Sequence, residues 1–416
     1  MTTPLLTLPS ARTGDFKIVS SVSAAHFVSH YYILLLPPLF DFIRSDYGLS
    51  FTELSLALTA FNIVSAAFQT PTGFLVDRLG ARTILVGGLV LGASGFAVAA
   101  AVHSYWLLVA MFAIAGLGNT AYHPADYAML SDHVSPERMG RAFSIHTFAG
   151  MLGSAVAPVT ILVLATTVGL KAALVVAGLV GPAVAIPLVW ARGVEGRTVA
   201  TRGGGRRGGA KRSAAGSVYT PAILGLAVFF VFLSLSTSGI SSFSVPALMS
   251  AFGLPFATAN LALTAYLMAS AFGVLGGGLV ADRTRRHSEV AAIGFAVNAL
   301  IVLMIGTVGL GAPLLIGAMG AAGLLSGMIM PSRDMLVRAA APPDAMGRAF
   351  GIVTAGMSLA GVIGPMLFGW IMDRGAPQWV FGASVVFMLA TVAMALFGDR
   401  RLARRRSPMA SSVGAA

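Results

Sequence analysis

Four ionisable side chains in otherwise apolar segments are spaced so that they pair on helical faces. His26 and His30 are four residues apart, and His123 and Asp126 are three apart, so each pair shares one face of a helix. Histidine changes charge near physiological pH, and a neighbouring carboxylate can take up or release a proton as well. Asp126, His123, His30 and His26 are therefore the predicted proton-coupling group. A further histidine, His146, lies in the next apolar segment and receives no predicted role.

One basic residue, Arg333, also lies inside an apolar segment, directly before Asp334. A guanidinium is always charged and recognises carboxylates and phosphates, so Arg333 is the predicted anion-binding residue. The sequence repeat described below places Arg333 opposite Asp126, which predicts an acid–base contact that forms and breaks. Four residues with hydrogen-bonding side chains complete the predicted substrate site: Thr237, Ser241, Tyr31 and Gln69.

Three histidines and an aspartate also match the ligand count of a metal site. Their spacing does not establish that they converge, and Arg333 would repel a cation, so we predict no metal site and no cofactor. The sequence has no cysteine. It also contains no nucleophile–base arrangement, phosphate-cradling loop or ATP-binding motif, and we expect no enzyme.

The composition is that of a chain with lipid as its solvent. It is 56% hydrophobic and 10% charged, with a mean hydropathy of +0.85. Because a bilayer is crossed by about 20 apolar residues in a helix, the sequence predicts twelve transmembrane helices, at approximately 18–43, 51–76, 83–102, 106–131, 141–165, 171–191, 219–250, 256–281, 289–310, 313–337, 347–372 and 378–398.

The chain repeats itself in two parallel halves. Gly48-Leu49-Ser50-Phe51 returns as Gly253-Leu254-Pro255-Phe256, and Met139-Gly140-Arg141-Ala142-Phe143 returns unchanged as Met346-Gly347-Arg348-Ala349-Phe350. In an apolar chain such a repeat is typical of a transporter whose substrate binds between the halves. We predict an all-α integral membrane fold with two pseudo-symmetric six-helix bundles, at 1–191 and 217–398, a cytoplasmic Gly/Arg-rich linker at 192–216 and a basic cytoplasmic tail at 399–416.

The basic residues predict the orientation in the membrane. The formal net charge of +12 could indicate nucleic acid binding, but 23 of the 27 Lys and Arg lie in the termini and in the connections that follow even-numbered helices. Only Arg44, Lys171 and Arg374 lie in the opposite connections. By the positive-inside rule both termini are predicted to be cytoplasmic, in a bacterial inner membrane. The basic linker is expected to contact anionic lipids, with no nucleic acid partner.

The turn after the second predicted helix carries a recognisable motif. Gly73, Asp77, Arg78, Gly80 and Arg82 follow the pattern G-x-x-x-D-R-x-G-x-R, which resembles the signature of the major facilitator superfamily. The second half repeats the acid–base pair as Asp282 and Arg283. The resemblance covers nearly the whole chain and implies twelve helices, a monomer, and a cytoplasmic latch in which the aspartate caps a helix end and pairs with arginines.

Two further resemblances concern the type of transport. The fifth and eleventh predicted helices carry a motif similar to that of drug/proton antiporters of the superfamily, at Gly150, Gly153 and Pro158 and again at Gly361, Gly364 and Pro365; these are interpreted as helix-packing and bending positions. His26, His30 and the pair His123-Pro124 resemble the fosmidomycin-resistance-like branch of the superfamily. In that branch a glutamate directly follows the proline, whereas here Asp126 comes two residues after Pro124.

Together these features predict a secondary active transporter that moves a small organic solute by alternating access. The expected activity is proton-coupled export, as an antiporter, of an organic anion or drug-like compound. The alternative is a proton-coupled or uncoupled importer of an organic acid or related metabolite. An alternative of another class is a transporter-like sensor or scaffold that binds its ligand without moving it.

Overall fold

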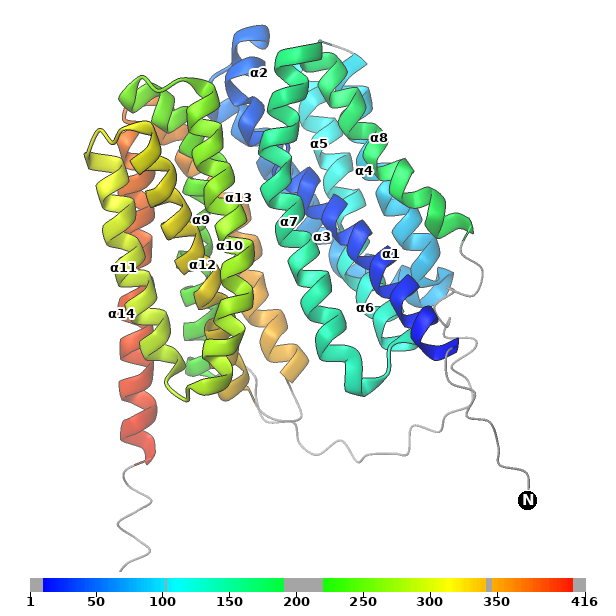
Figure 1. Cartoon of the computed structure of the whole chain (residues 1–416), viewed down its shortest axis with the longest axis vertical. Helices are drawn as coiled ribbons and strands as arrows, with labels where there is room; N and C mark the ends of the chain where they lie inside the picture. Colours follow the sequence, from blue (N-terminus) through cyan, green and yellow to red (C-terminus); the bar gives the residue numbers. More distant parts are fainter. Residues whose placement is uncertain (1–9, 102, 191–219, 342–345, 407–416) are drawn as a thin grey trace, which may run out of the picture.

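The structure is a computed structural model that describes residues 10–101, 103–190, 220–341 and 346–406, and this part of the chain consists of helices and no strands. Twelve of the described helical segments are long and apolar enough to cross a membrane. They form two bundles side by side (Figure 1). The first contains α1 (Ser10–Ile33), η1 (Pro37–Leu39), α2 (Phe40–Tyr47), α3 (Phe51–Leu79), α4 (Ala81–Ala101), α5 (Tyr105–Asn119), α6 (Tyr122–His133), α7 (Pro136–Val168) and α8 (Leu170–Trp190). The second contains α9 (Pro221–Phe252), α10 (Phe256–Arg283), α11 (His287–Thr307), α12 (Ala312–Ala340), α13 (Met346–Asp373) and α14 (Gln378–Arg406).

The prediction of one continuous helix at 18–43 is wrong. It is divided into α1, the short 3-10 helix η1 and α2, with a bend at residues 34–36. Pro37 and Pro38 cause this division, because a proline has no amide hydrogen to donate and its ring collides with the preceding turn. The break separates α2 from α1, and α2 lies at the top of Figure 1.

The fourth predicted helix, 106–131, is also divided, between α5 and α6. The amides of Thr120 and Ala121 bond to the carbonyls of Leu117 and Gly118, three residues back, which tightens the chain into a turn. Pro124 lies at the third position of α6, where a helix needs no amide donor. This break makes His123 and Asp126 part of the first turns of a separate short helix.

The last helix is longer than predicted and includes part of the expected tail. Helix α14 continues to Arg406 instead of ending at 398, and arginine is a good helix former that also complements the negative end of the helix dipole. The predicted linker, 192–216, lies outside the described residues.

The repeated Gly-Leu dipeptide ends a helix in each half. Gly48 follows α2 with φ 67°, and Gly253 follows α9 with φ 64°. This left-handed conformation is common at helix ends and favours glycine, since it has no Cβ. The repeat in the sequence thus corresponds to a repeated helix stop before α3 and α10.

Several contacts between the halves lie toward the end where α2 is found. Helix α3 packs against α13, and α7 against α10. The ring of Phe40 lies 5.3 Å from that of Phe243 and the ring of Phe42 lies 5.2 Å from that of Phe256. The buried Asn260 side chain donates a hydrogen bond of 2.9 Å to the carbonyl of Pro158. These aromatic and polar contacts hold α2, α7, α9 and α10 together at that end.

Candidate functional site

Three ionisable side chains from three helices meet inside the first bundle. Asp126 on α6 is completely buried, and His26 on α1 and His146 on α7 are 4% and 1% exposed. One carboxylate oxygen, Asp126 Oδ2, lies 3.6 Å from His26 Nδ1 and 3.8 Å from His146 Nε2. The carboxyl group is therefore placed between two imidazoles.

Two more histidines surround this group, and the five residues together are called the histidine cluster: His26, His30, His123, His146 and Asp126. The His26 ring stacks on that of His146 at 3.9 Å, and it lies 4.7 Å from the His30 ring and 5.3 Å from the His123 ring. The structure thus brings together all four residues of the predicted proton-coupling group and adds His146.

Many polar atoms of the histidine cluster lack a hydrogen-bond partner among the described protein groups. They are His26 Nδ1, His123 Nδ1, both ring nitrogens of His146 and both carboxylate oxygens of Asp126. His30 differs, since its Nδ1 lies 3.1 Å from the hydroxyl of Ser154. Burying such groups without partners costs free energy. Unpaired buried groups of this kind are expected where a protein binds a proton or a ligand.

Two glycines allow α7 to approach α1 at this point. A Cβ atom at Gly150 would lie 2.5 Å from Cδ2 of His26, and one at Gly153 would collide with the carbonyl oxygen of Phe27. The predicted packing positions of the fifth helix therefore lie directly against the histidine cluster. His146 comes about one helical turn before Gly150, so both residues lie on the face of α7 that meets α1. This spacing is the sequence feature from which the contact of His146 with His26 could have been predicted.

The other predicted packing positions lie on α7 and α13. A Cβ at Gly361 would lie 3.0 Å from Oδ1 of Asn62 in the opposite bundle, and one at Gly364 would lie 2.7 Å from Oγ of Ser238. Pro158 and Pro365 lie within α7 and α13, and both helices continue through them.

Arg333 has its contacts within the second bundle. Its Nε donates a hydrogen bond of 3.1 Å to Asp334, and its guanidinium lies over the Phe230 ring, 5.1 Å from the centroid. The predicted contact with Asp126 is not formed in the described chain. The reason is that Asp126 is enclosed among His26 and His146, whereas Arg333 remains partly exposed, at 14% of its side chain.

The remaining predicted substrate residues are spread over three helices. Tyr31 is buried and accepts a hydrogen bond of 3.2 Å from Thr160. The hydroxyls of Thr237 and Ser241 donate to carbonyls of their own helix, α9. Gln69 is exposed on α3.

The motif of the α3–α4 turn joins that turn to α8. The Arg82 guanidinium donates hydrogen bonds to the carbonyls of Leu188, at 2.6 Å, and of Val189. Those carbonyls belong to the last turn of α8, where orphan acceptors favour a cation. Asp77 and Arg78 are exposed at the end of α3, and Gly80 follows that helix. Gly73 lies about two turns before Gly80. Arg283 is exposed at the end of α10. The Asp282 side chain lies outside the described residues.

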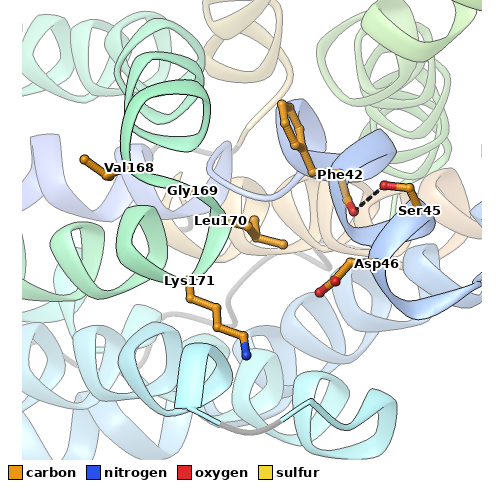
Figure 2. Close-up of a pocket in the computed structure, with 7 residues that line it drawn as sticks. All are labelled: Phe42, Ser45, Asp46, Val168, Gly169, Leu170 and Lys171. Carbon is orange, nitrogen blue, oxygen red and sulfur yellow. Dashed lines mark hydrogen bonds between the residues drawn. The ribbon is translucent and has the colours of Figure 1, made fainter.

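A shallow pocket of about 550 Å³ lies apart from these residues, between α2 and the junction of α7 and α8 (Figure 2). Asp46 and Lys171 line it from opposite sides, and the Ser45 hydroxyl donates a hydrogen bond of 2.9 Å to the carbonyl of Phe42. None of the predicted site residues lines this pocket.

A model of the Major Facilitator Superfamily matches residues 22–239 and again 224–415, so the two halves each match it. The chain belongs to this superfamily. It is therefore a transporter and not an enzyme, and it is a multi-pass protein of a bacterial inner membrane.

The chain is similar to named proteins of several bacteria, among them the following. The Fosmidomycin resistance protein of Escherichia coli (strain K12) is 25% identical over 297 residues, covering 70% of this chain and 72% of that protein. Multidrug resistance protein MdtH of Cronobacter sakazakii is 32% identical over 139 residues, covering 30% of this chain and 35% of that protein. A probable L-galactonate transporter of Escherichia coli is 27% identical over 144 residues, covering 35% and 32%.

Solved structures confirm the superfamily fold. A bacterial homolog of the human lysosomal transporter Spinster, in an inward-facing and unoccupied conformation, superposes with a TM-score of 0.77 over 93% of this chain and 97% of that chain, at 14% identity. The inward-facing and occupied form of the same protein gives a TM-score of 0.76. The predicted all-α membrane fold with twelve spans is thus confirmed.

Proposed function

We propose that this chain exports a small organic anion or drug-like compound in exchange for protons, by alternating access between its two bundles. The main support for the proposal is that the proton-binding groups and the fixed cation lie in different bundles. The histidine cluster provides proton-binding groups in the first bundle, and Arg333 provides a fixed cation in the second. The names of two relatives, a fosmidomycin and a multidrug resistance protein, support export.

In this proposal Asp126 carries the proton, assisted by His26, His30 and His123. An ionisable group in the middle of a membrane costs about 2.5–3.5 kcal/mol and is usually functional. The oxygens of Asp126 have no hydrogen-bond donor among the described protein groups, and a proton bound there would neutralise the buried charge. His146 belongs to the same group by its distance of 3.8 Å from the carboxylate.

Substrate recognition is assigned to Arg333, with Thr237, Ser241, Tyr31 and Gln69 as hydrogen-bonding groups. The guanidinium over the Phe230 ring offers both a charge and an apolar surface, which suits an organic anion. The bond of Arg333 to the exposed Asp334 can be exchanged for a bond to substrate, because both are charge-assisted hydrogen bonds.

The conformation is interpreted as inward-facing, with both termini in the cytoplasm. The contacts between the halves at the α2 end support this interpretation, since α1 begins and α14 ends at the opposite end (Figure 1). In the outward-facing state, Asp77, Arg78 and Arg82 with Asp282 and Arg283 would close the cytoplasmic end. The proposed transporter acts as a monomer in contact with membrane lipids, with no nucleic acid partner.

Import is the second candidate function. The likeness to a probable L-galactonate transporter supports an organic acid as its substrate, which would also suit Arg333. A sensor or scaffold without transport is the alternative of another class.

The test is to record intravesicular pH in proteoliposomes containing the purified protein. Organic anions, phosphonates and cationic drugs are added one at a time. The proposal expects proton movement evoked by an anion or a drug-like compound. Substrate flux without proton movement would contradict the coupling, and ligand-induced thermal stabilisation without any flux would favour the sensor.

A further inference from the structure

We propose that His26, Asp126 and His146 form a binding site for a divalent transition metal ion of the zinc class. Each residue offers one ligand atom, and the three atoms lie within 4.8 Å of one another. The residues come from α1, α6 and α7, so the site exists only in the folded bundle. This inference does not depend on the proposed function, and a bound metal ion would compete with a proton for Asp126.

The distances between the ligand atoms fit one small ion. Zinc binds imidazole nitrogen and carboxylate oxygen at about 2.0–2.2 Å, so tetrahedral ligand atoms lie about 3.4 Å apart. The distances from Asp126 Oδ2 to His26 Nδ1 and to His146 Nε2 are 3.6 and 3.8 Å. The three ligand atoms lie within 4.8 Å of one another, and the two imidazole rings are stacked. A shift of about 1 Å that tilts these rings apart would bring both nitrogens onto an ion bound by Asp126.

The unpartnered atoms of the same three residues provide the second, independent observation. Asp126 is completely buried, and neither of its oxygens accepts a hydrogen bond from a described protein group. His26 Nδ1 and His146 Nε2 also have no hydrogen-bond partner among these groups. Groups that would otherwise be costly to bury become satisfied when they coordinate a metal. The atoms that lack partners are thus the atoms that a metal would use.

The type of ligand selects the class of metal. Two imidazoles and one carboxylate suit zinc and the neighbouring first-row ions, whereas calcium and magnesium prefer oxygen ligands alone. Three protein ligands leave a fourth position of a tetrahedral ion for water or another group. His123 is the candidate for it, because its ring lies 5.3 Å from the His26 ring and its Nδ1 lacks a partner, whereas Nδ1 of the closer His30 is bonded to Ser154.

The structure also weakens the electrostatic argument against a cation. That argument depended on Arg333, but its guanidinium is paired with Asp334 and lies over Phe230, both in the second bundle. The carboxylate of Asp126, itself one of the three ligands, attracts a cation.

The direct test is zinc binding to purified protein that carries no polyhistidine tag, measured by titration calorimetry and by metal analysis after dialysis. The expected result is one zinc ion per chain. His146→Gln and His26→Gln should each lower the affinity at least about tenfold. His133→Gln is the matched control, since His133 lies on the same short helix as Asp126 and bonds to the carbonyl of Met129; its affinity should stay within about twofold of the unchanged protein.

A second measurement needs no variant and covers the case in which the substituted proteins do not fold. X-ray absorption of the zinc-loaded protein should show at least two imidazole nitrogens and one oxygen bound at about 2.0–2.2 Å. Absence of stoichiometric zinc, equal affinity of all the variants, or a metal bound by oxygens alone would overturn the proposal. Neither measurement uses a substrate or a proton gradient, so the metal site is tested separately from transport.

Discussion

The carboxylate of Asp373, in the last turn of α13, caps the start of α3 at Phe51 in the opposite bundle. Its two oxygens accept hydrogen bonds of 2.8 Å from the backbone amides of Phe51 and Thr52. These are two of the orphan donors of a helix start, and an anion is stabilising there because of the helix dipole. Ser50 and Glu53 satisfy further groups of the same turn as a capping box. The contact joins the two halves at the α2 end of the molecule.

Asp373→Ala should shift the conformational equilibrium toward opening at this end. Hydrogen bonds to a charged group contribute about 1.5–3 kcal/mol, so the open population should rise about tenfold or more. The measurement is the distance between spin labels on cysteines introduced at Trp106 and Trp379, which are exposed at the starts of α5 and α14. The natural chain has no cysteine that would interfere.

The matched control for this measurement is Asp46→Ala. Asp46 is an acid at the same end, but its contact is with His103 in its own bundle. Its removal should leave the distance distribution unchanged. If Asp373→Ala and Asp46→Ala behaved alike, Asp373 would have no special role in closing this end.

Gly150→Ala should damage the histidine cluster. The added Cβ would lie 2.5 Å from His26 and 3.0 Å from His30, so α7 or the rings must move. Overpacking of this kind costs about 1–3 kcal/mol, and thermal unfolding in detergent should shift to lower temperature. The control is Gly87→Ala on α4, where a Cβ would meet nothing within 4 Å. Equal unfolding temperatures for the two variants would contradict the described packing.

Arg333→Ala should weaken transport of anionic substrates specifically. Loss of a hydrogen bond to a charged group costs about 1.5–3 kcal/mol, so the KM for an anion should rise about tenfold or more. Arg333→Lys should lie between, because it keeps the charge but not the planar fork of donors. Arg338→Ala, at an exposed position of the same helix, serves as the control. Unchanged flux of anions through Arg333→Ala would exclude the assigned role.

The helices could be predicted from the sequence, because the length of an apolar segment is a local property. Ten of the twelve predicted spans each correspond to one described helix, with most ends shifted by a few residues. The division of the spans 18–43 and 106–131 into separate helices was not predicted, since a proline bends or ends a helix according to how its neighbours satisfy the freed carbonyls.

The site was predictable only in part. Spacing along one helix placed His26 with His30 and His123 with Asp126, but it carries no information about which helices touch. The role of His146 depends on the approach of α7 to α1 at Gly150, which is a property of packing. The predicted pairing of Asp126 with Arg333 was not found because symmetry-related positions in two bundles need not be in contact. Asp373 likewise acquires its partner only when α13 packs on α3.

The most direct test of the proposed mechanism is substrate-evoked proton movement in proteoliposomes with Asp126→Asn. Asparagine keeps the shape of the side chain but cannot carry the proton. We predict that the variant still exchanges labelled substrate across the membrane, while the pH change that accompanies net flux disappears. An undiminished pH change with Asp126→Asn would contradict the assignment of proton coupling to the histidine cluster.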